Sequence, residues 1–406
     1  MSIEKKPGKL AQALLLTPIR AYINTRSRII IKRNDTEDMN GPYVILANHV
    51  NNWDPLFLNC YVKEPICFIT GETLFRHPLL KRVLDFTGAI PKMKFKNDTR
   101  TIRSVLKAKK HDRVIGIFPE GNRNWDGRTE PLIYSTAKLV KLLDLPVVIA
   151  TIRGGYLSHP RWANSHRKGL ISISFVKTWD VGDFKNESPQ SIHSKLTNAL
   201  KYDEIGWQSE EQAQYNGKNL ANYLERLLFS CPSCQRIGNL FSTNDIFRCK
   251  QCGYTVRYTP LGTFEPEQNK LYFSTVHDWN MWQLNLLEET LFDPAWSNDW
   301  NQNLRDSVKL FVSDNERPFQ LESSGTISWN TTSPDLLCYQ DNNGKQYHFP
   351  IQDIEGINIH LHHKLDFFLK NKLYRIVFYH PRTSAYKWLK TIQFLQATKS
   401  RKLKEI

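Results

Sequence analysis

The chain has 406 residues, of which 40% are apolar and 23% charged, and it carries 55 Lys plus Arg against 40 Asp plus Glu. This composition argues against a disordered chain, and seven cysteines in so long a chain exclude a disulfide scaffold. The formal net charge of +15 predicts a polyanionic partner: nucleic acid, an anionic membrane surface or a phosphorylated substrate. No run reaches the roughly 18 apolar residues of a membrane span, so we expect a cytoplasmic protein, peripheral on the inner face of a membrane.

Most of the surplus charge lies near the start of the chain. Residues 1–110 hold 20 Lys plus Arg against 9 Asp plus Glu, whereas residues 111–230 and 231–406 each have a surplus of only 2. In residues 1–33, basic side chains interleave with leucines, a pattern that predicts a basic amphipathic helical segment. This segment either lies on an anionic membrane surface or packs on the protein with its basic face in solvent.

Residues 34–228 alternate short apolar runs with helical patterns. The runs at residues 42–47, 114–118, 146–152 and 171–176 have the length and composition of buried strands. Helical patterns cover residues 99–110, 132–143 and 188–230. This alternation predicts an α/β domain with a largely parallel sheet.

A histidine and an aspartate follow the first of these strands. His49 lies in an Asn-rich turn, and Asp54 comes five positions later, before Pro55. On one regular helix the two side chains diverge, so they meet only if His49 lies in the loop and Asp54 in the first turn of the next helix. A carboxylate placed there orients the imidazole as a general base. The alternative is a helix cap, with Pro55 at the first helical position.

A second polar loop follows the strand at residues 114–118. It contains Glu120, Gly121 and Arg123. The glycine lets the backbone approach a ligand, and the arginine offers planar donors that suit a phosphate group. Taken alone, the loop also fits an ordinary turn with a surface arginine.

Together these motifs resemble those of the glycerolipid acyltransferases typified by 1-acylglycerol-3-phosphate O-acyltransferase. Asn48-His49 followed by Asp54 is similar to one motif of that family, and Phe118-Pro119-Glu120-Gly121 followed by Arg123 is similar to another. Residues 71–91 and 145–149 resemble two further motifs in the family's order. The close resemblance covers residues 41–150.

The resemblance implies an acyl transfer to a lysophospholipid. His49 takes the proton from the acceptor's hydroxyl as that hydroxyl attacks an acyl thioester, and Asp54 orients His49. The thioester is acyl-CoA or acyl-carrier protein. Glu120, Gly121 and Arg123 help to bind the acceptor's phosphate.

The chain departs from the family's pattern at two places. Lys92 and Lys94 stand near the position of a family arginine, and they supply point charges without a bidentate fork. Asn122 and Asn124 replace a threonine and a serine but still form hydrogen bonds. We expect 1-acylglycerol-3-phosphate as the acceptor, with other lysophospholipids left open.

Two cysteine pairs lie within residues 229–259. Cys231 and Cys234 precede Cys249 and Cys252, with fourteen residues between the pairs. Four thiolates complete a tetrahedral zinc shell with no vacant position, which predicts a structural zinc ribbon. Redox chemistry needs only one pair.

Residues 260–406 have a different pattern. A helix is expected at residues 277–292, short alternating strands between 306 and 379, and a terminal amphipathic helix at 384–396. This order predicts a small, mostly-β domain closed by a helix, which resembles pleckstrin-homology-like or GRAM-like domains in architecture. Such a domain binds lipid headgroups or a protein, or serves as a scaffold.

The leading hypothesis is a peripheral acyltransferase of phospholipid synthesis or remodelling. The alternatives are a zinc-ribbon protein that binds nucleic acid and an inactive lipid-binding scaffold. We expect no nucleic acid, because the surplus charge is remote from the ribbon. The presence of both His49 and Asp54 argues against an inactive scaffold. The sequence indicates no oligomeric state.

Overall fold

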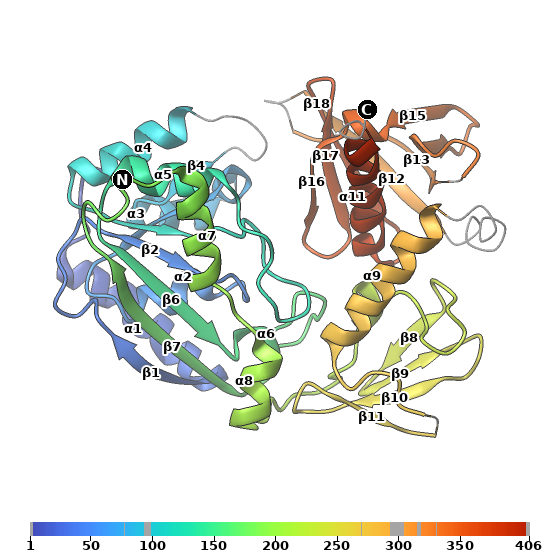
Figure 1. Cartoon of the computed structure of the whole chain (residues 1–406), viewed down its shortest axis with the longest axis horizontal. Helices are drawn as coiled ribbons and strands as arrows, with labels where there is room; N and C mark the ends of the chain where they lie inside the picture. Colours follow the sequence, from blue (N-terminus) through green and yellow to red (C-terminus); the bar gives the residue numbers. More distant parts are fainter. Residues whose placement is uncertain are drawn as a thin grey trace. The chain divides into compact units, whose positions relative to one another are not determined.

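The chain forms two compact units (Figure 1). The computed structural model describes residues 3–76, 78–92, 99–268, 270–292, 304–314, 318–329 and 331–402, and Lys94 lies outside them. The first unit consists of Met1–Arg161 and Ser165–Gly217, and the second of Trp162–Asn164 and Lys218–Ile406.

The first unit is built on a seven-stranded sheet with the order β1-β7-β6-β2-β5-β3-β4 (Figure 1). Its strands are β1 (Arg28–Asn34), β2 (Val44–Ala47), β3 (Ile66–Gly71), β4 (Ile90–Lys92), β5 (Val114–Ile117), β6 (Val147–Arg153) and β7 (Leu170–Trp179). The strands from β6 to β4 are parallel, as the sequence predicts. However, β7 runs antiparallel to β6 and pairs in parallel with β1, so the sheet is mixed.

Helices cover both faces of this sheet. They are α1 (Lys9–Arg26), α2 (Asp54–Asn59), α3 (Pro78–Thr87), α4 (Thr99–Lys110), α5 (Ser135–Leu143), α6 (Gly155–Ser158), α7 (Pro189–Ala199) and α8 (Glu204–Glu211), with a 3-10 turn at Glu72–Arg76. On one face of the sheet, alternate residues of β2 and β6 pack against α1, α2 and α6. On the other face, the intervening residues of the same two strands pack against α4, α5 and α7. Because both faces are covered, the central strands are apolar throughout.

The basic amphipathic segment is shorter than the sequence predicts. Helix α1 ends at Arg26, and Ser27 is extended, with φ −151° and ψ 150°. Arg28–Asn34 then forms a strand instead of continuing the helix, because three consecutive isoleucines favour a strand. Among the described residues, no helix has the length and apolar character needed to cross a membrane.

The second unit begins with a four-stranded antiparallel sheet of order β11-β10-β9-β8. Its strands are β8 (Leu240–Thr243), β9 (Ile246–Cys249), β10 (Thr255–Tyr258) and β11 (Phe264–Pro266). Residues 188–230 are only partly helical, since loops and a 3-10 turn at Leu224–Arg226 follow α8. The long helix α9 (Val276–Phe292) comes after this small sheet.

A seven-stranded antiparallel sheet and a terminal helix complete the second unit. The strands are β12 (Arg305–Ser313), β13 (Gln320–Ser328), β14 (Leu336–Asp341), β15 (Gln346–Pro350), β16 (Glu355–His360), β17 (Lys364–Leu369) and β18 (Lys372–Phe378), with a 3-10 turn at Ile351–Asp353. The sheet order is β15-β14-β13-β12-β18-β17-β16, and the helix is α11 (Ala385–Lys402). The mostly-β end with a terminal helix is therefore confirmed, although the sequence did not predict β17. Its relation to pleckstrin-homology-like domains stays a prediction.

Candidate active site

The two predicted motif loops meet at one edge of the first unit's sheet. Strands β2 and β5 are parallel neighbours, with Val44 opposite Ile115. The carboxyl ends of parallel neighbours lie at the same edge, so the loops that follow them are adjacent. The backbone confirms this, because the N–H of Asn124 donates to the carbonyl of His49 at 2.9 Å.

His49 and Asp54 form a hydrogen-bonded pair. His49 Nδ1 lies 2.8 Å from Asp54 Oδ2, with His49 in the loop and Asp54 at the start of α2. The same oxygen accepts the backbone N–H groups of Val50 at 2.7 Å and Asn51 at 2.8 Å, and Asp54 is fully buried. An Nδ1–H that donates to this carboxylate leaves Nε2 free to accept a proton.

The surroundings of His49 keep its imidazole neutral. Burial lowers its pKa from 6.5, the charges of Arg123 and Arg161 lower it further, and Asp54 opposes the shift. The ring stacks on Phe118 with centroids 4.4 Å apart, and 21% of the side chain remains exposed. A neutral, partly accessible imidazole at pH 7 is suited to general-base chemistry.

Two asparagines fix the histidine loop to β6 and α6. Asn48 donates to the carbonyl of Ile152 at 2.9 Å and accepts from the same residue's N–H at 2.8 Å. Asn51 donates to the Gly155 carbonyl and to Ser158 Oγ, each at 3.0 Å. The Asn-rich turn was visible in the sequence, but these roles were not, because the partners lie more than a hundred residues away.

Glu120 joins the loops through backbone contacts. Its Oε1 accepts the N–H of His49 at 2.7 Å, and its Oε2 accepts the N–H of Glu130 at 2.8 Å. Glu120 is 5% exposed, and burial raises its pKa to about 8. Both carboxyl oxygens thus face backbone donors, and the part of Glu120 in phosphate binding stays a prediction.

Gly121 and Arg123 occupy the turn after Glu120. Gly121 has φ +71°, and a Cβ there would lie 2.6 Å from Ile133 Cδ1, so the position requires glycine. Burial lowers the pKa of Arg123 to about 10, with the Asp54 charge opposing. Arg123 Nη1 is buried and has no hydrogen-bond partner among the described residues. A buried guanidinium with an unused donor is prepared for an anion.

Of the two predicted lysines, only Lys92 lies within the described residues. Lys92 ends strand β4, at the same edge of the sheet as the His49 loop but with β5 and β3 lying between β4 and β2. Lys94 lies outside the described residues. Sequence reasoning missed Arg161, whose Nη1 donates to the Arg123 carbonyl at 2.7 Å.

The four predicted zinc ligands come together in the second unit. The Sγ atoms of Cys231, Cys234, Cys249 and Cys252 all lie within 4.8 Å of one another. Gly253, at φ +76°, turns the chain beside the second pair. Four sulfur atoms at this spacing, with no other ligand type, fit a tetrahedral zinc ion.

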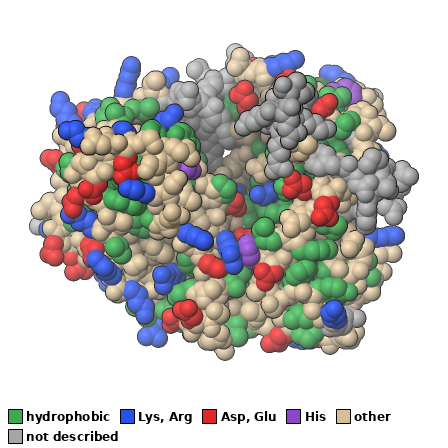
Figure 2. Space-filling view, viewed as in Figure 1, with side chains coloured by type: hydrophobic (Ala, Val, Ile, Leu, Met, Phe, Trp, Pro, Cys, Tyr) green, Lys and Arg blue, Asp and Glu red, His purple; other side chains and the backbone are tan. Residues whose placement is uncertain are grey.

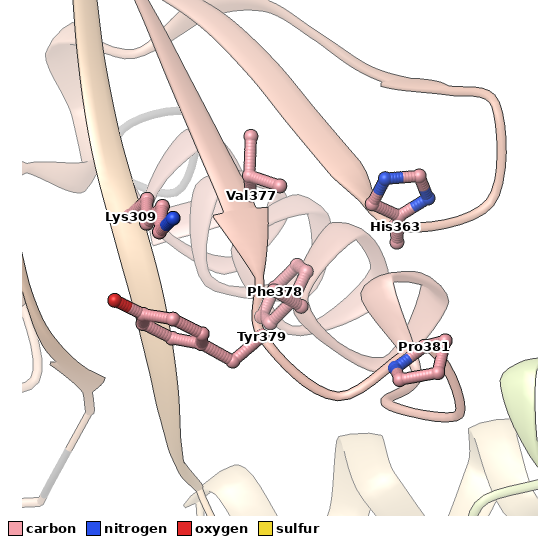
Figure 3. A pocket seen from close by; sticks show the side chains of 6 residues that line it. All are labelled: Lys309, His363, Val377, Phe378, Tyr379 and Pro381. Carbon is pink, nitrogen blue, oxygen red and sulfur yellow. The ribbon is translucent and has the colours of Figure 1, made fainter. Parts of the chain in front are cut away.

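A pocket of about 280 Å³ lies elsewhere in the second unit. Its lining residues are far along the chain from every predicted site residue. Figure 3 shows its six lining residues, Lys309, His363, Val377, Phe378, Tyr379 and Pro381. Lys309 Nζ stands 5.3 Å from the centroid of the Tyr379 ring. The pocket therefore contains a cation on an aromatic ring but none of the proposed acyl-transfer groups.

The visible surface does not display one dominant basic area. On the face drawn in Figure 2, Lys and Arg side chains are interspersed with Asp and Glu side chains. A nucleic-acid footprint would instead gather positive charge in one patch or stripe. This face therefore gives no support to the nucleic-acid alternative.

Comparisons with known proteins agree with the resemblance seen in the motifs. Residues 26–153 match the family model described as Acyltransferase. The 1-acyl-sn-glycerol-3-phosphate acyltransferase of Borreliella burgdorferi is 32% identical over 109 residues, 25% of this chain and 42% of that protein. The protein of the same name from Helicobacter pylori is 29% identical over 141 residues, 33% of this chain and 59% of that protein. The chain thus spans about half the length of these two relatives.

A solved structure gives a further comparison. It is the 1-acyl-sn-glycerophosphate (LPA) acyltransferase, PlsC, from Thermotoga maritima, with a TM-score of 0.42 and 18% identity. The match covers 50% of this chain and 82% of that chain. The family-model match includes both motif loops, from His49 and Asp54 to Arg123. Residues 26–153 therefore resemble an acyltransferase family over the region that holds both motif loops.

Proposed function

We propose that the protein is an O-acyltransferase that moves a fatty acyl chain from an acyl thioester to the free hydroxyl of a lysophospholipid. The observation that carries this proposal is the 2.8 Å contact between His49 Nδ1 and Asp54 Oδ2 within the region that resembles the acyltransferase family. The thioester is acyl-CoA or acyl-carrier protein. The names of the relatives favour 1-acylglycerol-3-phosphate as the acceptor.

The proposed reaction uses His49 as a general base. Its Nε2 takes the proton from the acceptor hydroxyl while the hydroxyl oxygen forms a bond to the thioester carbonyl carbon. The carbon–sulfur bond then breaks, and the imidazolium returns its proton to the thiolate that leaves. Asp54 stabilises the imidazolium between these steps and is itself held by the N–H groups of Val50 and Asn51.

Arg123 supports an acceptor that carries a phosphate. Its guanidinium is buried beside the His49–Asp54 pair, and Nη1 has no partner within the described parts of the chain. Planar guanidinium donors match phosphate oxygens in geometry and charge. Glu120 and Gly121 would shape the loop that presents Arg123.

Helix α1 supports attachment to an anionic membrane surface. Leu10 and Leu14, one helical turn apart, are 76% and 70% exposed, and Tyr22 is 48% exposed. Exposed leucines beside the basic side chains of this helix are typical of segments that lie in the headgroup layer. The protein would then reach its lipid acceptor as a peripheral membrane protein.

The cysteine cluster supports a structural zinc ion. Cys231, Cys234, Cys249 and Cys252 would hold it, and four protein ligands leave no position for a substrate. The zinc would stabilise the fold around the two turns. Trp279 Nε1 donates to the carbonyl of Ser230, the residue before Cys231, at 2.9 Å, so α9 packs directly against this site.

The test is product formation by the purified protein. Oleoyl-CoA or oleoyl-acyl-carrier protein is offered with lysophosphatidic acid, lysophosphatidylglycerol, lysophosphatidylcholine or monoacylglycerol, and diacyl products are measured by mass spectrometry. We expect phosphatidic acid as the main product, with one thiol released per acyl chain. Absence of a diacyl product with every pair would refute the proposal, whereas transfer only to another lysophospholipid would correct the headgroup.

A further inference from the structure

A basic segment that no motif predicted lies beside the Arg123 loop. It follows α6 and contains His159 and Arg161. Arg161 is 6% exposed, and its guanidinium carbon stands 4.2 Å from the centroid of the Trp125 ring. Its Nη1 donates to the backbone carbonyl of Arg123. Arg161 therefore fixes the backbone of Arg123 and adds a second buried guanidinium to the same place.

Several buried polar atoms in this region lack partners. They are Arg123 Nη1, the side-chain oxygen and nitrogen of Asn124, and His159 Nδ1, all without a hydrogen bond to any residue that the structure describes. Asn124 is fully buried, and Arg123 is half-buried, with its Nη1 atom out of contact with solvent. Buried donors are normally satisfied, so neighbouring unsatisfied ones indicate a missing ligand.

The electrostatics of the region identify that ligand as an anion. Burial is the main cause that lowers the pKa of both His49 and His159. The charge of Arg123 lowers both further, and the charge of Arg161 also lowers that of His49, so these four groups lie near one another. Asp54, the carboxylate that acts on Arg123, already accepts three hydrogen bonds. The pKa of His159 falls to about 4, so at pH 7 it is neutral and donates a hydrogen bond without adding charge.

We propose that His159 and Arg161 complete, with Arg123, a buried site for the phosphate monoester of the acceptor. Arg123 and His159 Nδ1 donate to the phosphate oxygens. Arg161 is a positioning residue that holds Arg123 and contributes charge. The identity of the anion as the acceptor's phosphate rests on the proposed function. Two guanidinium groups favour a phosphate monoester dianion over a singly charged phosphodiester.

Binding of a soluble headgroup tests the site without requiring turnover. The probe is sn-glycerol 3-phosphate, measured by calorimetry at pH 7.5 with the full chain. We expect His159→Leu and Arg161→Gln each to weaken binding about tenfold or more. His159→Asn should bind within about threefold of wild type, because its amide N–H replaces the Nδ1 donor. Arg128→Gln is the matched control, because Arg128 follows in the same loop, is 43% exposed and pairs with Asp203.

If Arg161→Gln fails to fold, the comparison of His159→Leu with His159→Asn still decides the test. Equal binding by His159→Leu, His159→Asn and wild type, or no binding of the probe by wild type, would overturn the inference. In acyl transfer, the His159→Leu and Arg161→Gln variants should raise KM for lysophosphatidic acid but not for monoacylglycerol. A purely structural role would instead impair both acceptors. Binding that depends on His159 in a protein without acyl transfer would refute the proposed function and leave the phosphate site standing.

Discussion

Replacing Asp54 by asparagine separates the two tasks that the structure gives this carboxylate. Asp54 Oδ2 orients His49 and also accepts the N–H groups of Val50 and Asn51. An asparagine oxygen can keep both backbone contacts, so the loop should retain its shape. The variant loses the negative charge that stabilises the imidazolium, while the same amide oxygen still accepts from Nδ1–H.

The hydrogen bonds of Asp54 determine how much stability and how much activity the variants lose. A hydrogen bond to a charged group contributes about 1.5–3 kcal/mol and a neutral one about 0.5–1.5, so weakening the two backbone bonds by about 1–1.5 kcal/mol each costs about 2–3 kcal/mol. Loss of the charge should lower kcat/KM by about 10²–10⁴. Asp54→Ala is different, because it leaves two buried N–H groups without an acceptor, at about 1–3 kcal/mol each.

The assay compares these variants in acyl transfer and in thermal unfolding followed by circular dichroism. We expect Asp54→Asn to fold with a modest loss of stability and to be nearly inactive, and Asp54→Ala to be clearly less stable. An Asp54→Asn variant with kcat/KM within about threefold of wild type would refute the assigned role. Equal stability of Asp54→Ala and wild type would contradict the claim that Asp54 stabilises the loop through its backbone hydrogen bonds.

Three further predictions concern pH, metal and membrane. Because the folded pKa of His49 lies below 6.5, the acyl-transfer rate should be constant above pH 6.5 and fall only at lower pH. Since the unfolded histidine binds its proton first as the pH falls, the stability of the fold should also decrease below pH 6.5. A rate that still rises above pH 7 would contradict the lowered pKa. Metal analysis should find one zinc per chain, and Cys234→Ser or chelation should lower the unfolding temperature; a metal-free protein of full stability would count against the zinc. Leu10→Glu with Leu14→Glu should weaken sedimentation with phosphatidylglycerol vesicles, whereas Val181→Glu, at another exposed apolar position outside α1, should not. Equal sedimentation of both variants would exclude α1 as the contact.

The sequence was informative where local pattern decides the structure. The helix expected at residues 99–110 coincides with α4, and the apolar runs at 114–118 and 146–152 are β5 and β6 within one residue. The His49–Asp54 contact was also predictable, because it depends only on a loop of five residues followed by a helix start. The helical prediction for residues 1–33 is wrong from Arg28 onward. There the β-branched residues and the pairing with β7 favour a strand over a helix.

The parts that were not predictable depend on distant partners. The sequence predicts that Glu120 helps to bind phosphate, but no motif specifies its contacts with the N–H groups of His49 and Glu130. Arg161 acts on a carbonyl 38 residues earlier, and Asn48 on a strand 104 residues later. Such contacts arise only when the sheet places the ends of β2, β5 and β6 together. Strand β17 was not predicted, although it is as long as β14 and β16; it directly follows two histidines.

The most direct test of the central claim is the rate at which His49→Ala transfers a radiolabelled acyl chain from acyl-CoA to lysophosphatidic acid. His193→Ala, on α7 of the same unit, serves as the matched histidine control. We predict that His49→Ala loses at least about 10² in kcat while His193→Ala keeps the wild-type rate. Wild-type turnover by a folded His49→Ala protein would contradict the assignment of His49 as the general base.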